Sequence, residues 1–163
     1  MTLFTTILAG VSVFVLGQVF LKWMLEPVQD LRKVIAEILF YLASDHSTIH
    51  NVEIVNKEEA LSVGKNLERL GARLLASQNL IPFYGKARKV FGLPKHESIA
   101  FASKRLSLIS KSMFGKEQDI HYKLDLYRID VCESLGIDDP IQGGMTKQEL
   151  KDGIKEIQSQ NRA

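Results

Sequence analysis

The stretch LFTTILAGVSVFVLGQVFL, residues 3–21, decides the fold because it contains no charged side chain. Its 19 residues would extend about 28 Å as an α-helix, at about 1.5 Å per residue, and the hydrocarbon core of a bilayer is about 30 Å thick. Lys22 and Trp23 follow directly, and both side chains suit the interface between lipid and water. The sequence therefore predicts a transmembrane anchor over residues 1–25.

Two other interpretations of this apolar run are less favoured. A cleaved signal peptide normally begins with basic residues and ends at a small-x-small cleavage site. Here only Met1 and Thr2 precede the run, and Lys22-Trp23-Met24-Leu25 follows it. A buried helix of a soluble protein rarely stays uncharged over this length. We therefore expect the helix to be retained and to span a membrane.

The basic residues around the run predict its orientation. No Lys or Arg precedes it, whereas Lys22, Arg32 and Lys33 follow it closely. The positive-inside rule then places the C-terminal part of the chain in the cytoplasm. Cys132 is the only cysteine, so the chain cannot form an internal disulfide, which agrees with a reducing compartment.

Beyond the anchor, apolar residues recur at helical spacing and Gly and Pro separate the segments. Pro27 is expected either to start a helix or to kink one that continues from the membrane. The polar residues 44–55 are expected to form a connection. The predicted fold is all-α, with an N-terminal transmembrane helix followed by a small cytoplasmic helical bundle over residues 26–137. The expected helices cover residues 28–43, 56–79, 82–91, 99–113 and 120–135, the last two forming an antiparallel hairpin.

Several positions predict how these helices begin, end and pack. Asn56 and Glu59 form a potential capping box, in which Asn56 accepts from the amide of Glu59. Gly64 and Gly71 lie on the apolar side of their helix, which indicates close packing against another helix. Residues 138–163 are expected to be a turn-rich tail with a short amphipathic helix, capped by Thr146 and Glu149.

Charge is unevenly distributed, although the net charge is only +2. Residues 84–116 carry 8 basic and 1 acidic group, and residues 117–163 carry 6 and 10. Against an anionic leaflet, each cation would add up to about 1 kcal/mol of attraction. The alternative is a solvated face balanced by the acidic tail, and nucleic acid is not expected because no reader motif is present. The residues expected to contact the lipid surface are Lys22, Arg32, Lys33, Lys86, Arg88, Lys89, Lys104 and Arg105.

Within the anchor, Thr6 and Gly10 form a small-xxx-small pair, and Gly17 continues roughly the same side. A flat strip of this kind lets another helix approach closely in lipid. We expect Thr6, Gly10 and Gly17 to form a helix-association face, with a second copy or another membrane protein as the partner.

Known catalytic signatures are absent from the sequence: it has no phosphate-binding loop, no GxSxG, no HExxH and no dinucleotide fingerprint. No catalytic, cofactor-binding or metal-binding residue is assigned, and no cofactor is expected. His46 and His50 have the spacing of metal ligands on a helix, but their segment is expected to be a loop. His96 and His121 are expected to be solvated. Asp130 and Glu133 flank Cys132 and would raise the pKa of its thiol, so we expect a buried, unreactive cysteine.

Two segments carry a resemblance to known proteins: EPVQDLRKVIAEILFYL at residues 26–42 and LGARLLASQNLIPFYG at residues 70–85. Together with the preceding apolar span they resemble a group of small, functionally uncharacterised bacterial single-pass membrane proteins. The resemblance covers about residues 3–91. It implies a location in the bacterial inner membrane and supplies no activity.

These observations favour a non-enzymatic, membrane-anchored protein with a scaffolding or regulatory role. Two alternatives from other classes remain open. One is a membrane-active effector, such as a toxin or phage-defence component, that acts by oligomerisation. The other is a metal-dependent enzyme that uses His46, His50 and a carboxylate brought near them by folding.

Overall fold

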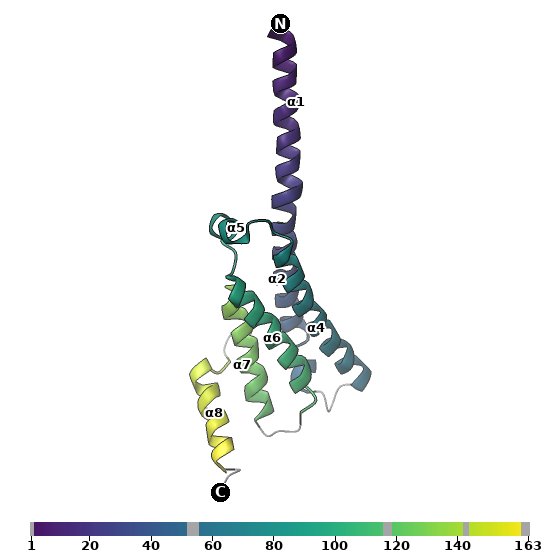
Figure 1. The fold of residues 1–163 in the computed structure, drawn as a ribbon. Coiled ribbons are helices and arrows are strands. Elements are labelled where there is room, and N and C mark those ends of the chain that lie inside the picture. The colour runs from purple at the N-terminus through teal and green to yellow at the C-terminus, as the bar shows by residue number, and fades with distance from the viewer. Residues whose placement is uncertain (1, 52–55, 116–118, 142–143, 161–163) are drawn as a thin grey trace.

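The computed structural model describes residues 2–51, 56–115, 119–141 and 144–160, and over these residues the chain is helical with short connections. A long stalk projects from a helical bundle, with a further helix along its outside (Figure 1). The all-α prediction is confirmed. The stalk is α1, the bundle consists of α2, α4, α6 and α7, and the outer helix is α8. Their bounds are α1 Thr2–Phe20, α2 Glu26–Ser44, α4 Lys57–Asn79, α6 His96–Ser112, α7 Ile120–Leu135 and α8 Lys147–Gln160.

The stalk continues into the bundle without a break. A π-helical turn, η1 (Leu21–Leu25), joins α1 to α2, and the amide of Glu26 donates to the carbonyl of Leu21. Pro27 has no amide hydrogen, and its ring would collide with the carbonyl four residues earlier in an α-helix. The wider π turn just before Pro27 relieves this conflict. The helix therefore continues past Pro27, which lies in the first turn of α2, and runs on to Ser44 (Figure 1).

The core lies between the four bundle helices, because each turns one apolar stripe inward. α4 packs against both α2 and α6, and α6 packs against α7, which runs in the opposite direction (Figure 1). The predicted antiparallel hairpin is thus confirmed. Side chains with at most 2% exposure include Leu31, Ile38, Leu42, Leu67, Leu70, Leu74, Ile99, Leu106, Ile109, Leu124 and Val131.

The two glycines of α4 lie at its contact with α6, as predicted. A Cβ atom on Gly64 would lie 3.0 Å from Ser110 Oγ. A Cβ atom on Gly71 would lie 3.2 Å from both the backbone carbonyl oxygen and the Oγ of Ser103. Because glycine has no Cβ atom, α4 and α6 can approach each other closely at these two positions.

The helix ends agree with the sequence in most places. Asn56 caps α4, although its side chain accepts from the amide of Glu58 at 3.2 Å and not from that of Glu59. Gly92 and Gly136 end their helices with positive φ angles of 65° and 69°. The predicted capping box of α8 is present, because the Thr146 amide donates to Glu149 Oε2 at 2.7 Å and the Glu149 amide donates to Thr146 Oγ1 at 3.4 Å.

Two local predictions require correction. Residues 44–55 are not simply a connection, because His46–His50 form a one-turn helix, α3; residues 52–55 lie outside the described part. The short helix expected to start at Pro82 is α5 (Tyr84–Phe91). It starts later because Phe83, directly before it, has a left-handed backbone with φ 50°.

A buried carboxylate joins three elements and attaches α8 to the bundle. Asp130 on α7 forms ion pairs with Arg105 of α6 at 2.9 Å and with Lys147 of α8 at 2.7 Å. Lys147 also contacts Glu133 at 2.6 Å. Leu150, on the inner side of α8, is buried. The C-terminal helix is therefore fixed both by charge and by an apolar contact.

Candidate functional site

The first group of candidate site residues lies at the end of the bundle from which the stalk emerges. We call this region the stalk end and define it as η1, the Leu80–Phe83 turn and α5. α5 lies beside the base of the stalk (Figure 1). Its inner side is fixed by Ala87, which is fully buried, and the buried residues Ile81 and Leu93 flank it.

The outer side of the stalk end carries unusually exposed apolar residues. Among the described residues beyond α1 and η1, the three most exposed large apolar side chains are Val90 at 75%, Phe83 at 73% and Leu80 at 68%. Trp23 of η1 is 66% exposed. Large apolar side chains gathered at one end of a domain are typical of a surface that meets a partner or a membrane.

Phe83 is held in a strained backbone conformation. Its φ and ψ of 50° and 43° lie in the left-handed region, which costs an L-residue with a bulky side chain about 1–2 kcal/mol. Burial of the Phe83 ring does not offset this cost, because the ring is exposed to solvent. Strain of this kind is often found at functional sites.

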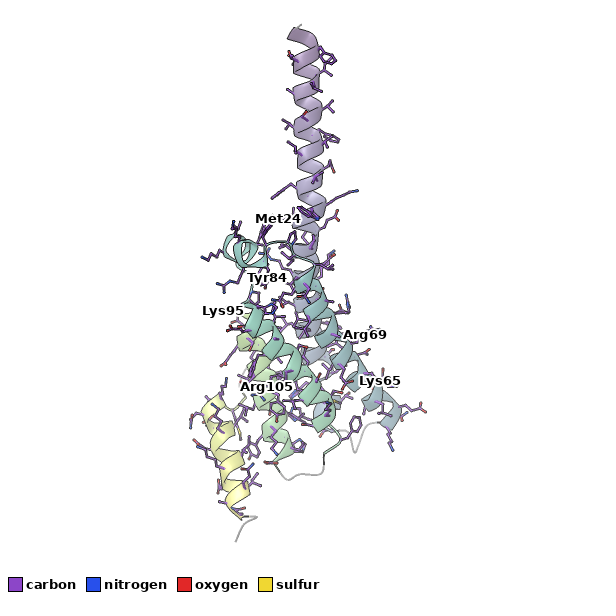
Figure 2. All side chains as sticks on the ribbon, viewed as in Figure 1. Met24, Lys65, Arg69, Tyr84, Lys95 and Arg105 are labelled. Atoms are coloured by element: carbon purple, nitrogen blue, oxygen red, sulfur yellow. The ribbon has the colours of Figure 1, made fainter. Side chains whose placement is uncertain are left out.

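Hydrogen bonds connect the stalk end to the rest of the fold. Arg32 of α2 donates to the carbonyl of Phe91, the last residue of α5, at 2.6 Å. Tyr84 donates through its hydroxyl to the carbonyl of Pro94 at 2.7 Å. Met24 and Tyr84 are both half-buried against the core, and Figure 2 shows them at the same end of the bundle. α5 is thus held in a fixed position beside the stalk.

Six of the eight predicted lipid-contacting cations lie in or next to the stalk end. Lys86 and Lys89 project from α5 as exposed residues, and Arg88 is half-buried. Lys22 in η1 and Lys33 near the start of α2 are exposed, and Arg32 forms the hydrogen bond to α5. A shallow hollow between α5 and the start of α6 adds further polar groups. It is lined by Tyr84, Gly85, Arg88, Lys95, His96 and Glu97.

The remaining two predicted cations lie apart from this group, about halfway along α6. Arg105 is packed between the rings of Phe101 and Tyr127, at 4.7 and 4.8 Å from their centroids, and pairs with Asp130. Its charge thus serves the contact between α6 and α7, and Figure 2 shows it well below the stalk end. Lys104 is exposed next to it.

The stalk exposes apolar side chains on all sides. Its one described serine hydroxyl is satisfied internally, because Ser12 donates to the carbonyl of Leu8 at 2.8 Å. A Cβ atom on Gly10 or Gly17 would meet no atom within 4 Å, so the strip that these residues form with Thr6 is open. The structure holds a single chain, and the helix-association face stays a prediction.

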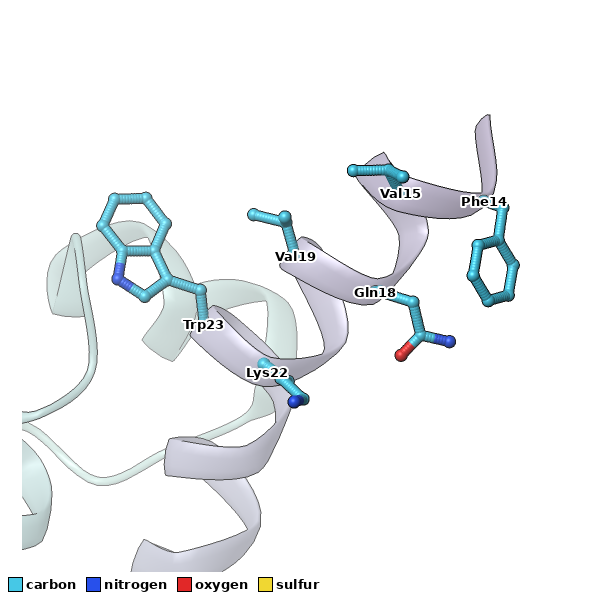
Figure 3. A pocket seen from close by; sticks show the side chains of 6 residues that line it. All are labelled: Phe14, Val15, Gln18, Val19, Lys22 and Trp23. Atoms are coloured by element: carbon cyan, nitrogen blue, oxygen red, sulfur yellow. The ribbon is translucent and has the colours of Figure 1, made fainter. Parts of the chain in front are cut away.

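One side of the stalk also has a hollow, shown in Figure 3, between side chains of the same helix. Phe14, Gln18 and Lys22 are spaced four apart, as are Val15, Val19 and Trp23, so two adjacent rows form its walls. The hollow opens outward along its whole length.

A second group of candidate site residues lies between α3 and α7. The His46 and His50 rings have centroids 4.4 Å apart, and His50 Nε2 lies 3.3 Å from Asp125 Oδ1. One ligand atom from each of His46, His50 and Asp125 lies within 4.8 Å of the other two. His121 stacks on His50 with centroids 5.6 Å apart. The sequence singled out only the two histidines of α3, because Asp125 and His121 are far away along the chain.

Burial and neighbouring charges shift the pKa values of two groups in this cluster, His46 and Asp125. Arg128 is almost fully buried and contacts Asp125 at 3.1 Å and Asp139 on its other side. Burial alone would raise the pKa of Asp125, but its contacts with His50 and Arg128 outweigh this and lower the pKa. Burial, together with His50 and Arg128, lowers the pKa of His46. At neutral pH the cluster therefore holds an ionised carboxylate and a neutral His46.

Cys132 is 2% exposed, as predicted for an unreactive cysteine. Burial is the main cause that raises the pKa of its thiol to about 11, and Asp139 and Glu133 add to the effect. The thiol is therefore not a nucleophile at neutral pH.

Comparison with models of protein families, with curated proteins and with solved structures finds no match for this chain. The resemblance to bacterial single-pass membrane proteins stays a prediction.

Proposed function

We propose that this chain is a membrane-anchored helical scaffold or regulatory interaction protein without catalytic activity. In this proposal α1 crosses the bacterial inner membrane once, the stalk end rests on the cytoplasmic leaflet, and the rest of the bundle projects into the cytoplasm. There it binds a partner protein or further copies of the chain.

The observation that carries the proposal is the surface of the stalk. α1 is long and apolar enough to span a membrane, and its span is not covered by any other part of the described chain. A buried core helix would be covered by its neighbours. In water, side chains such as Phe4, Val13, Phe14 and Leu16, which are 67–72% exposed, would be unfavourable. A bilayer is the environment that accommodates them.

The stalk end supports a position for the bundle relative to the bilayer. Lys22 and Trp23 mark the level at which the apolar surface ends, and α5 lies at this level beside them. Phe83 and Val90 would enter the interfacial layer, while Lys86 and Lys89 would meet anionic headgroups. This arrangement limits how the bundle can tilt on its anchor and so fixes which faces a partner can reach.

Topology can be tested with single cysteines, since Cys132 is buried. We expect a membrane-impermeant maleimide to label Lys104→Cys only after spheroplasts are permeabilised, and Thr2→Cys in intact spheroplasts. Labelling of the first variant in intact spheroplasts would reverse the proposed orientation. Recovery of a shortened chain lacking the N-terminus would instead indicate a cleaved signal sequence.

The interaction role is tested by photo-crosslinking in living cells from exposed positions of α4, such as Lys65 and Arg69. Reproducible crosslinks to one protein, or to a second copy, support a scaffold. The proposal is contradicted if crosslinks to any one protein are never more frequent than crosslinks to an unrelated cytoplasmic control protein.

A membrane-active effector is the alternative that shares the same anchor. It predicts growth arrest on overexpression that depends on helix association in the bilayer. Gly10→Leu would block the open strip of α1 and should abolish such an arrest. Growth unaffected by overexpression of the unmodified chain argues against the effector and leaves the scaffold proposal in place.

A further inference from the structure

We propose that His46, His50 and Asp125 form a binding site for a divalent transition-metal ion, for which Zn²⁺ is the best-suited ion. This site lies at the opposite end of the bundle from the stalk end, because α3 follows the far end of α2 (Figure 1). It is separate from the lipid-facing surface and goes beyond the scaffold proposal.

The geometry of two facing helices carries the inference. Residues four apart lie on the same side of a helix, so α3 presents His46 and His50 together. α7 presents His121 and Asp125 with the same spacing opposite them. One ligand atom from each of His46, His50 and Asp125 lies within 4.8 Å of the other two. Ligand atoms in a tetrahedral zinc site are about 3.4 Å apart, so small side-chain rotations would close the site.

The ligand types favour a borderline transition metal over Mg²⁺ or Ca²⁺. Two imidazole nitrogens and one carboxylate oxygen form a donor set typical of Zn²⁺, whereas the hard cations prefer oxygen ligands only. Three protein ligands leave a fourth position for water or for a group from a partner. His121, stacked on His50, restricts the orientation of that imidazole.

The local charge also suits a cation. Arg128 brings one positive charge close to Asp125, but Asp139 contacts the same guanidinium. These three groups together carry one net negative charge. Arg128 would therefore orient the carboxylate of Asp125 without cancelling its attraction for a metal ion. The side chains of His50 and Asp125 are 14% and 29% exposed, so the ion can enter from solvent and is then partly shielded.

Metal binding would have a structural consequence. α3 belongs to the connection between α2 and α4, and it contacts α7 through this cluster. An ion held by both elements would fix this connection to the hairpin of α6 and α7. Binding should therefore stabilise the folded chain, because the unfolded chain lacks a preformed site.

The test uses the full chain in detergent micelles, freed of metal with a chelator and titrated with ZnCl₂ by calorimetry. We expect one Zn²⁺ per chain and a rise in the thermal midpoint. His46→Ala, His50→Ala and Asp125→Asn should each weaken binding by about 10-fold or more and remove the rise. His96→Gln, at the one histidine outside the cluster, is the matched control and should bind as the unmodified chain does.

Circular dichroism without metal shows whether each variant folds. If His46→Ala does not fold, His46→Gln, with a side chain of similar size, takes its place. Absence of Zn²⁺ binding by the folded, unmodified chain would overturn the proposal. The proposal would also be overturned if His96→Gln weakened Zn²⁺ binding as much as His50→Ala does. Neither result bears on membrane anchoring, which depends on α1.

Discussion

Arg32 Nη2 donates a hydrogen bond to the backbone carbonyl oxygen of Phe91 across 2.6 Å, and so links the first turns of α2 to the last residue of α5. A cation at the C-terminal end of a helix is also favourable for the helix dipole. Because α2 continues from the stalk, this contact couples the position of α5 to the anchor. The proposed lipid surface depends on that coupling.

Removal of this side chain should loosen α5. We expect Arg32→Ala to lower the free energy of unfolding by about 1 kcal/mol, since a hydrogen bond from an exposed charged donor is lost. Amide hydrogen exchange in α5 should become faster. Lys33→Ala is the matched control, because Lys33 is exposed and pairs with Asp30 within the same helix. Equal exchange in both variants would show that Arg32 does not hold α5.

Substitution of Phe83 by glycine should change the stability of the fold and its binding to lipid in opposite directions. Phe83→Gly should raise the free energy of unfolding by about 1 kcal/mol, because glycine adopts positive φ without the cost borne by phenylalanine. It should also weaken binding of the bundle surface to anionic lipid, because the ring is lost.

Phe83→Ala provides the control for that experiment, since it removes the ring and keeps the strain. Depth can be measured by placing the only tryptophan at this position, as Trp23→Phe with Phe83→Trp, and quenching it with brominated lipids in proteoliposomes. Strong quenching is expected for a side chain at the interface. A tryptophan that is quenched only by aqueous iodide would contradict contact of the stalk end with lipid.

The contact between α4 and α6 predicts a penalty for added volume. We expect Gly71→Ala to destabilise the fold by about 1–3 kcal/mol, because its Cβ would meet the backbone of Ser103 at 3.2 Å. Gly85→Ala is the control, since a Cβ there meets no atom within 4 Å, and it should be neutral or stabilising by up to about 1 kcal/mol. Chemical denaturation measures both. Stabilisation by Gly71→Ala would show that the two helices can separate at little cost.

The raised pKa of Cys132 predicts slow alkylation. With a pKa of about 11 against an ordinary value of 9.0, the folded chain should hold about 100-fold less thiolate at pH 8 than the unfolded chain. Iodoacetamide should therefore react at least that much more slowly in native buffer than in guanidinium chloride. The stability linked to this thiol is complete below pH 9 and is lost as the pH rises through about 11. Equal alkylation rates would place Cys132 at the surface.

The sequence predicts local structure better than it predicts the sites. Periodicity and the capping residues Gly92, Gly136, Thr146 and Glu149 define most helices, because these signals act over a few residues. The π turn before Pro27 is not predicted, because a proline at this position is compatible with either a helix start or a kink. The one-turn helix α3 is not predicted, because it depends on contacts with the rest of the bundle. α3 gains its stability from tertiary packing, because five residues do not form a helix alone.

The same reason limits what charge can predict about the candidate site. Charge alone groups Lys86 and Lys89 of α5 with Arg105, and it does not reveal that Arg105 pairs with Asp130, 25 residues away. Contact of Lys86 and Lys89 with lipid stays a prediction. The spacing of His46 and His50 was visible in the sequence. Asp125 became part of the cluster only when α7 folded against α3, and no short-range pattern connects these positions.

The transmembrane role of α1 is tested most directly by cell fractionation. Cells that express the full chain are broken in buffer without detergent, and the membranes are separated from the supernatant. We predict that the intact chain of 163 residues sediments with membranes and stays there after extraction with alkaline carbonate. Detergent alone should release it. Recovery of the uncleaved chain as a folded monomer in the supernatant would contradict the transmembrane role of α1, and the proposed function with it.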